Sequence, residues 1–347
     1  MGKFKIVQTA APAGADLPME REGLGEFADG LVSYGALDTP EKLIEACSDA
    51  DACLVPGQRF TANVIGNLER CRVIVRYGVG YDVIDVEEAS KKGIVVVNIP
   101  DFCLSEVANH ALALLLDGAK KISRQDRWIR TGAWHGGRAP FLSPMGPIHG
   151  ETVGLIGFGQ IAQAFRRRLA ALDMNVLVYD PFLPRERAEA LDVELVSLED
   201  LLTRSDYVSI HVPLLPTTQH LIDAEKLALL KPTAYLINTS RGPVIDQDAL
   251  IEALQEGRIA GAGLDVFEVE PLPADSPLLH IETVTMTPHD ASYADSTVRT
   301  MWRRVGQEAA LALRGRMPNT PVNLAAEPNM AWLQRWPPRP GWCEDRL

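Results

Sequence analysis

Three polar residues in the last third of the chain have side chains suited to acid–base chemistry on a small acid: Arg241, Glu270 and His289. Each follows a short apolar run, and runs of this kind are typical of buried parallel strands. Because open parallel sheets bind ligands at the carboxyl ends of their strands, we expect the three side chains to meet at one sheet edge. A cation, a carboxylate and an imidazole there can bind a carboxylate, tune a proton donor and transfer a proton. The three runs are 234–238, 261–267 and 283–288.

Similar runs recur along the chain and alternate with helical patterns, which predicts an α/β fold of parallel sheets joined by right-handed crossovers. Residues 104–122 predict a long helix, apolar on most of its surface, with Ser105 as its N-terminal cap. Residues 296–314 predict a helix that returns the chain to its first domain. The other predicted strands are 4–9, 52–55, 73–76, 94–98, 176–179 and 207–212, with a further strand opening at Thr152.

Composition limits the class of protein. A length of 347 residues predicts two domains, and a hydrophobic content of 46% with 23% charged residues is ordinary for a globular protein. The net charge of −12 argues against nucleic acid or an anionic membrane surface as the main partner. No stretch approaches a membrane span, and the five cysteines lack the paired spacing of a zinc site. We therefore expect a cytoplasmic protein with reduced thiols and no metal.

The final segment departs from this regularity, because Trp332, Trp336 and Trp342 lie among three prolines. The proline content excludes a regular helix. We expect the indoles to pack on the body or on a partner subunit, with disorder as the alternative.

A G-x-G-x-x-A pattern follows the strand that opens at Thr152 and is typical of a dinucleotide-binding turn. Gly157 permits the tight turn, and Gly159 lets the backbone approach a pyrophosphate. The following helix start, at Gln160 and Ile161, offers N–H groups and positive potential to phosphate. The alternative is a glycine turn that serves only packing.

Asp180 strengthens the cofactor prediction, because it ends the next strand near the spacing expected for the acid on the adenosine ribose. A carboxylate there repels a 2′-phosphate, so NAD is favoured over NADP. Arg185 and Arg187 follow closely and soften that preference. The alternative role for Asp180 is to cap the next turn.

With the cofactor turn and the three polar residues in place, the chain resembles the D-isomer-specific 2-hydroxyacid dehydrogenases from near residue 50 to residue 323. Within that family, residues 73–82 and 106–111 are most similar to bacterial proteins of the C-terminal-binding-protein branch. The motifs that carry the resemblance, in the family's order, are 76–82, 154–162, 237–243, 264–271 and 287–289.

The resemblance implies two doubly wound α/β domains, with the chain crossing twice between them. Residues 1–115 and 296–347 are expected to form the substrate domain and residues 116–295 the NAD-binding Rossmann domain. The family's members are usually homodimers joined through the cofactor domain, and residues 132–150 resemble their dimer arm.

The same resemblance implies a role for each of the three polar residues. Arg241 grips the substrate carboxylate and polarises the keto oxygen, and a loop-capping role is its alternative. His289 is the general acid, against the alternative of a structural imidazole. Glu270 pairs with His289 and favours the imidazolium, and it is preferred over Glu268 because the family's acid directly precedes Pro271.

Other positions are assigned to ligands by resemblance, with turn formation and packing as the alternative for all of them. Asp265 would contact the nicotinamide amide, while Asn238, Thr239 and Ser240 would line the cofactor side of the cleft. Backbone N–H groups of two residues would bind the substrate carboxylate. These two are Val79 and Gly80, and residues expected near the adenine and ribose are Val212, Pro213, Leu214 and Thr218.

In the segment that follows His289, two residues differ from the branch pattern. Asp290 places a second carboxylate beside the histidine, and Ser292 stands where the branch has tryptophan. The serine removes apolar surface from the substrate pocket, which puts a preference for an apolar substrate in doubt.

The function implied is reversible, NAD-dependent reduction of a small 2-keto acid to a D-2-hydroxy acid. An NAD(H)-sensing regulatory protein of the corepressor type is the alternative. A formate or phosphite dehydrogenase is a third possibility, although Glu270 argues against the formate enzyme, which has glutamine there.

Overall fold

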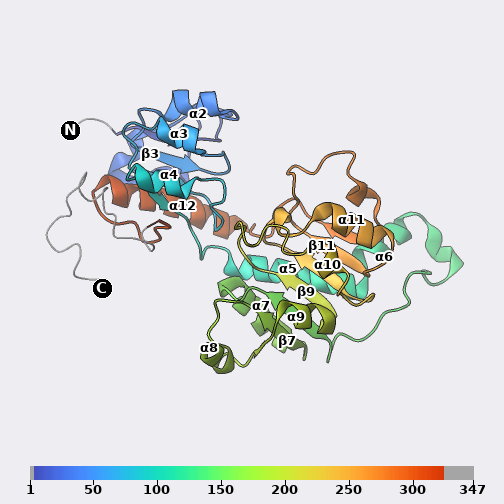
Figure 1. Ribbon diagram of the computed structural model, residues 1–347. Coiled ribbons are helices and arrows are strands. Elements are labelled where there is room, and N and C mark those ends of the chain that lie inside the picture. The colour runs from blue at the N-terminus through green and yellow to red at the C-terminus, as the bar shows by residue number, and fades with distance from the viewer. Residues whose placement is uncertain (1–3, 324–347) are drawn as a thin grey trace. The chain divides into compact units, whose positions relative to one another are not determined.

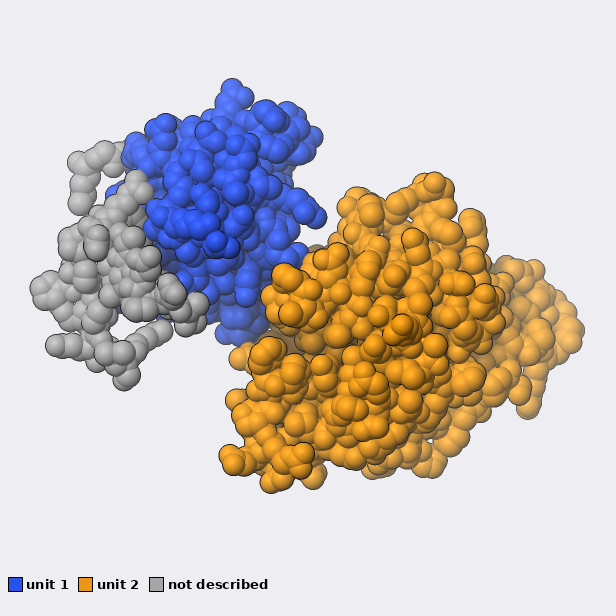
Figure 2. All heavy atoms as spheres, in the orientation of Figure 1, with its two compact units in different colours: residues 1–102, 294–347 blue, residues 103–293 orange. Residues whose placement is uncertain are grey.

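The computed structural model describes residues 4–323, which form two compact units, each built on one parallel sheet (Figures 1 and 2). One unit comprises residues 1–102 and 294–347 and the other residues 103–293, so the chain passes between them twice, as predicted. The tryptophan- and proline-rich segment lies outside the described residues. No helix within 4–323 is long and apolar enough to span a membrane.

The first unit has a five-stranded parallel sheet in the order β2-β1-β3-β4-β5. One face packs on α1 and α12, and the other on α2, α3 and α4. The α1 and α12 backbones approach so closely that a Cβ on Gly306 would lie 2.3 Å from the Glu20 carbonyl oxygen. The elements are β1 (Ile6–Gln8), α1 (Pro18–Leu24), β2 (Leu31–Ser33), α2 (Pro40–Cys47), β3 (Ala52–Val55), α3 (Ala62–Gly66), β4 (Val73–Arg76), α4 (Val86–Lys91), β5 (Val95–Val97) and α12 (Asp295–Leu313).

The second unit has a seven-stranded parallel sheet in the order β12-β11-β10-β9-β6-β7-β8. Helices α5 and α7 pack on one face, and α9, α10 and α11 pack on the other. The strands are β6 (Thr152–Ile156), β7 (Asn175–Tyr179), β8 (Glu194–Leu195), β9 (Tyr207–Ile210), β10 (Tyr235–Asn238), β11 (Gly261–Leu264) and β12 (Val284–Met286). The helices are α5 (Leu104–Lys120), α6 (Ile122–Arg130), α7 (Gln160–Ala170), α8 (Arg185–Ala190), α9 (Leu198–Arg204), α10 (Ala224–Leu227) and α11 (Gln247–Gln255).

The chain builds β7 and β8 on one side of β6 and then returns to place β9 on the other side. The switch point of the sheet therefore lies between β6 and β9, where open α/β sheets bind ligands. Gly157, after β6, has φ +87°, and a Cβ there would lie 2.8 Å from Val212 Cγ1. Glycine is thus required at this turn by its conformation and by the loop after β9.

The predicted parallel α/β architecture is confirmed, but several details differ. Strands β2 and β8 were not predicted. The expected cap at Ser105 is wrong: α5 begins after Cys103, and no side chain caps it. The compact units divide between residues 102 and 103, not at 115, because all of α5 packs within the second unit against α7, β10 and β11.

His211, directly after β9, is a largely enclosed imidazole whose Nε2 lies 2.9 Å from Ser209 Oγ. Its ring packs against the Phe165 ring at a centroid distance of 5.6 Å. Burial lowers the pKa of His211 to about 4, because the charged form loses its hydration. The folded protein therefore keeps this histidine neutral in weak acid.

We expect His211→Gln to flatten the pH dependence of folding stability between about pH 6.5 and pH 4. In the wild type the unfolded chain takes up a proton in this window and the folded chain does not, so the free energy of unfolding falls as the pH falls. The loss reaches at most roughly 3 kcal/mol. Urea unfolding of the wild type and the variant across this pH range measures the free energy of unfolding. Parallel dependence on pH in the two proteins would contradict a neutral, buried His211.

Candidate active site

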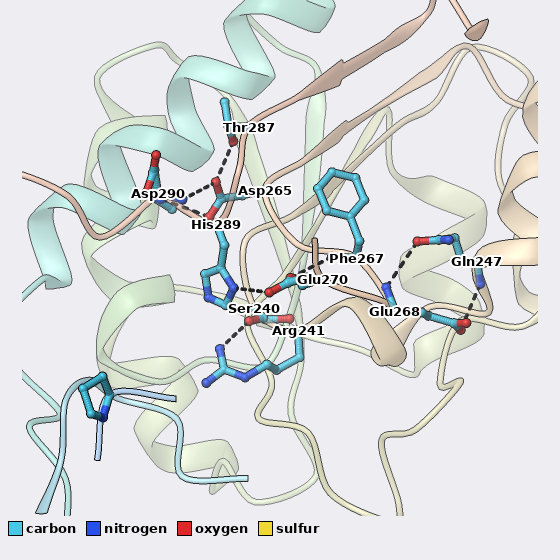
Figure 3. A network of polar contacts seen from close by, with 12 residues as sticks. Ser240, Arg241, Gln247, Asp265, Phe267, Glu268, Glu270, Thr287, His289 and Asp290 are labelled. Atoms are coloured by element: carbon cyan, nitrogen blue, oxygen red, sulfur yellow. Dashed lines mark hydrogen bonds and ion pairs between the residues drawn. The ribbon is translucent and has the colours of Figure 1, made fainter. Parts of the chain in front are cut away.

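The carboxyl ends of three adjacent parallel strands carry the three predicted polar residues. Strand β11 lies between β10 and β12, with Leu264 opposite both Asn238 and Met286. Figure 3 shows the Arg241, Glu270 and His289 side chains gathered beyond these strand ends. The expectation that the sheet would bring them together is confirmed by this register.

Glu270 and His289 form an ion-pair contact, with Glu270 Oε2 2.7 Å from His289 Nδ1. The other oxygen, Oε1, accepts a hydrogen bond from the Phe267 N–H at 3.0 Å, so both oxygens are oriented. Partial burial by itself raises the pKa of Glu270, but the bonds from His289 and Phe267, with the charges of His289 and Arg241, outweigh it. The pKa therefore lies below 4.5, and Glu270 is an anion at neutral pH.

His289 has an unusual backbone conformation, with φ +59°. Left-handed conformations are unfavourable for residues with a Cβ and persist where surrounding contacts hold them. The His289 N–H donates to the Asp265 carbonyl at 2.8 Å, and the Asp265 carboxylate accepts from the N–H groups of Asp290 and Ala291. These contacts aim the imidazole at Glu270.

Arg241 is presented by a turn that Asn238 closes. The buried Asn238 side chain donates to the Arg241 carbonyl at 2.9 Å and accepts from the Ser240 N–H at 3.0 Å. The guanidinium donates from Nη1 to the Ser240 carbonyl and lies close enough to Glu270 to lower its pKa (Figure 3). The next residue, Gly242, packs directly on the segment before Glu270, because a Cβ there would lie 1.9 Å from the Phe267 carbonyl carbon.

Glu268, the competitor of Glu270 in the sequence, is held by other partners. Its Oε1 lies 2.7 Å from His220 Nε2 and accepts from the Gln247 N–H at 3.2 Å. Figure 3 shows its carboxylate on the side away from the imidazole of His289. Of these two glutamates, only Glu270 contacts His289.

The two residues that depart from the branch pattern have different environments. Asp290 is exposed, and its carboxylate points away from the His289 ring in Figure 3. Ser292 is half-buried. Asp290 therefore contributes its backbone N–H to the loop, while its carboxylate makes no contact with the imidazole.

The turn between β6 and α7 fits a dinucleotide pyrophosphate. No heavy atom lies within 4 Å of a Cβ built on Gly159, and no side chain caps α7, which begins at Gln160 and Ile161. Asp180, after the adjacent strand β7, accepts from the Phe158 N–H in the same turn at 2.9 Å. A cofactor here would meet open space, helix N–H groups and a carboxylate fixed beside the turn.

The remaining predicted ligand residues are in several environments. The Thr218 hydroxyl bonds within its own loop, donating to the Pro213 carbonyl at 2.6 Å. Thr239 Oγ1 is buried without a partner, whereas Asp265 is buried and already accepts three hydrogen bonds. Val79 and Gly80 belong to the first unit. Their roles toward ligands stay predictions.

Thr287 and His110 belong to the same network, although neither was predicted to have a role. Thr287 Oγ1 donates to Asp265 Oδ1 at 2.6 Å, and His110 Nε2 lies 2.8 Å from Thr287 Oγ1. Thr287 lies in a motif that carries the family resemblance and His110 in the segment 106–111 that resembles the branch, which was the available signal. Within residues 4–323, no group of three histidine, cysteine, aspartate or glutamate residues is arranged to hold a metal.

Comparison with known proteins identifies the family. Residues 112–291 match the NAD-binding domain of the D-isomer-specific 2-hydroxyacid dehydrogenases. The chain is 42% identical to glyoxylate reductase of Korarchaeum cryptofilum over 282 residues, which cover 81% of this chain and 85% of that protein. The chain belongs to this family.

Other members of this dehydrogenase family extend the comparison. D-3-phosphoglycerate dehydrogenase of Methanocaldococcus jannaschii is 40% identical over 88% of this chain, which spans only 56% of that longer protein. D-lactate dehydrogenase of Aquifex aeolicus, solved with NAD and lactic acid, superposes with a TM-score of 0.79 at 29% identity, covering 90% of this chain and 96% of that one. The chain is thus an NAD-dependent oxidoreductase of the 2-hydroxyacid dehydrogenase family.

Two glycine substitutions separate cofactor binding from folding. We expect Gly159→Ala to weaken NADH binding roughly tenfold or more, because the methyl group enters the space left for the pyrophosphate, while stability changes by less than about 1 kcal/mol. Gly242→Ala, in contrast, forces two loop backbones apart and lowers stability. NADH fluorescence titration and thermal unfolding measure the two effects. Unchanged NADH affinity in Gly159→Ala would contradict the assignment of this turn.

Proposed function

We propose that the protein reduces a small 2-keto acid to the D-2-hydroxy acid with NADH, and that it catalyses the reverse oxidation. The observation that carries the proposal is the Glu270–His289 pair with the Arg241 guanidinium beside it, at the sheet edge that also holds the dinucleotide turn. A carboxylate anchor and a proton donor together suit a substrate with adjacent carboxylate and carbonyl groups.

The Glu270–His289 hydrogen bond determines which imidazole nitrogen exchanges a proton with the substrate. The ionised Glu270 only accepts, so His289 Nδ1 carries the proton of their hydrogen bond, and Nε2 is the atom that exchanges a proton with substrate. Arg241 binds the carboxylate through two N–H groups and polarises the neighbouring carbonyl. Bound NADH would supply the hydride for the reduction. The His289 imidazolium gives its Nε2 proton to the carbonyl oxygen in reduction, and the neutral imidazole takes the hydroxyl proton in oxidation.

Relatives support the substrate class. The similar glyoxylate reductases, the lactate dehydrogenase and an NADPH-dependent glyoxylate/hydroxypyruvate reductase of Sinorhizobium meliloti, 31% identical with a TM-score of 0.79, are named for small 2-keto or 2-hydroxy acids. A corepressor function is not favoured by these relatives.

We also propose that the chain belongs to the C-terminal-binding-protein branch of the family, on the basis of the motifs 73–82 and 106–111. NAD is preferred over NADP on the position of Asp180.

We assign substrate binding to the first unit and cofactor binding to the second, the roles that the resemblance implied for residues 1–115 with 296–347 and for residues 116–295. Support in the first unit comes from a loop fixed on two sides. The Asn98 side chain donates to the Val79 carbonyl at 2.6 Å, and the Ile99 N–H donates to the Gly78 carbonyl at 2.9 Å. A fixed loop suits the expected use of the Val79 and Gly80 N–H groups for a carboxylate.

A cytoplasmic location completes the proposal, supported by the four free cysteines among the described residues.

The proposal predicts NADH oxidation when the purified protein meets glyoxylate, hydroxypyruvate, pyruvate or a longer 2-keto acid, with a D-configured product. His289→Ala should lower kcat by about 10²- to 10⁴-fold, because the proton donor is lost. Arg241→Lys should raise KM roughly tenfold or more, because lysine lacks the bidentate fork. Absence of turnover with every acid, or activity that His289→Ala leaves intact, refutes the proposal.

Glu270→Gln and Glu268→Gln form a matched pair of variants. Only the former should lower kcat, by roughly tenfold or more, because only Glu270 contacts His289. Its folded-state pKa lies below 4.5, so its stabilising contribution is present above that pH and is lost as the pH falls through the lower folded-state value. The stability difference between wild type and Glu270→Gln should therefore disappear in strong acid. Equal kinetic losses in both variants would contradict the assignment.

We also propose that the protein is a homodimer joined through α6 and residues 132–150. Support comes from three exposed apolar side chains, those of Ile122, Ile129 and Trp134, and from an adjoining groove of about 730 Å³ lined by α6 and residues 279–286. Trp134→Ser should shift the mass measured by sedimentation from dimer toward monomer. Phe182→Ser, which removes an exposed aromatic elsewhere in the same unit, should not. A monomeric wild type would contradict the proposal.

A further inference from the structure

A chain of hydrogen bonds connects the face of α5 to the loop that carries His289. His110 Nε2 lies 2.8 Å from Thr287 Oγ1, which lies 2.6 Å from Asp265 Oδ1. The Asp265 side chain is 1% exposed and that of His110 23% exposed. The hydrogen bonds therefore run from a partly accessible imidazole through one hydroxyl group to a buried carboxylate, and His110 Nε2 also lies 3.6 Å from Asp265 Oδ1.

The chemistry of the groups fixes the direction of these bonds. The Asp265 carboxylate accepts from the Asp290 N–H at 2.9 Å and the Ala291 N–H at 3.0 Å, so it acts as an acceptor. The single hydroxyl proton of Thr287 points to Asp265, and the Thr287 oxygen must accept its second bond. His110 consequently donates from Nε2–H.

Asp265, at the end of this series of hydrogen bonds, holds the backbone around His289. Asp265 uses its carboxylate for the N–H groups that follow His289 and its carbonyl for the N–H of His289 itself. The residue held by these bonds has a left-handed backbone, which relaxes unless it is held. Orientation of the Asp265 carboxylate is therefore coupled to the orientation of the catalytic imidazole.

We propose that His110 is a positioning residue for His289, acting through Thr287 and Asp265, an inference that rests on the proposed function of His289 as the proton donor. The Nε2–H of His110 keeps the Thr287 hydroxyl directed at Asp265, and Asp265 then holds the loop in its strained conformation. His110 touches none of the reacting atoms in this scheme. Its loss should slow proton transfer without weakening cofactor binding.

Nitrogen–proton correlation spectra of the histidine rings test the bond direction without any substrate. The ring signals of His110 are assigned by comparison with His110→Gln. They should show a protonated Nε2 in the wild type, and Thr287→Val should remove the preference for this tautomer. An unprotonated Nε2 in the wild type overturns the inference. This result is independent of the proposed function, because it requires no turnover.

Paired variants test the consequence for catalysis. His110→Leu and Thr287→Val remove the donor and the hydroxyl, and each should lower kcat about three- to tenfold while the Kd for NADH changes less than about twofold. His110→Gln keeps an N–H donor, and Thr287→Ser keeps the hydroxyl, so both should remain within about twofold of wild type. Thermal unfolding of all four variants controls for folding.

The outcomes separate the two proposals. A wild type without 2-keto acid reduction refutes the proposed function, whereas an active wild type with unchanged kcat in His110→Leu and Thr287→Val refutes the positioning role. Equal losses in His110→Leu and His110→Gln assign His110 to packing and also refute it. If Thr287→Val fails to fold, the comparison of His110→Leu with His110→Gln and the ring spectrum of the wild type still test the positioning role.

Discussion

Burial of the Asp265 carboxylate is the constraint from which the geometry of the site follows. A charged group removed from water must have hydrogen-bond donors, and Asp265 obtains them from the Thr287 hydroxyl and from two backbone N–H groups beyond His289. Meeting that requirement folds the chain after β12 into a tight loop over the end of β11. The cost of the left-handed residue at position 289 is thereby offset by these hydrogen bonds.

Much of this arrangement was predictable because it depends on strand order. Short apolar runs bounded by glycine, proline and polar residues indicated β10, β11 and β12, and parallel strands necessarily deliver the following residues to one edge. β8 was not predictable, because it has two residues and lies at the sheet edge. β2, three residues at the edge of the other sheet, was also missed. Ser105 resembled a cap, but the chain entered α5 two residues earlier.

The family pattern chose between two chemically similar residues, Glu268 and Glu270, but the physical reason for the choice needed coordinates. Glu268 is held by His220 and Gln247, which leaves Glu270 to contact His289. His110 lies 177 residues from Thr287, so no local pattern indicates their contact. Similarly, Asp180 was predicted from its spacing to the glycine turn, whereas its bond to the Phe158 N–H, which orients it before any cofactor arrives, is a property of the folded turn.

The contact of Gly242 with the Phe267 backbone has a consequence for how the protein can be altered. The turn that bears Arg241 and the segment that bears Glu270 meet backbone to backbone, so neither can shift without the other. Side chains at the margin, such as the half-buried Ser292, are not part of that contact. Substitutions at such positions can therefore change the proposed pocket wall while the spacing between Arg241 and Glu270 stays constant, which under the proposed function separates the choice of substrate from the chemistry performed on it.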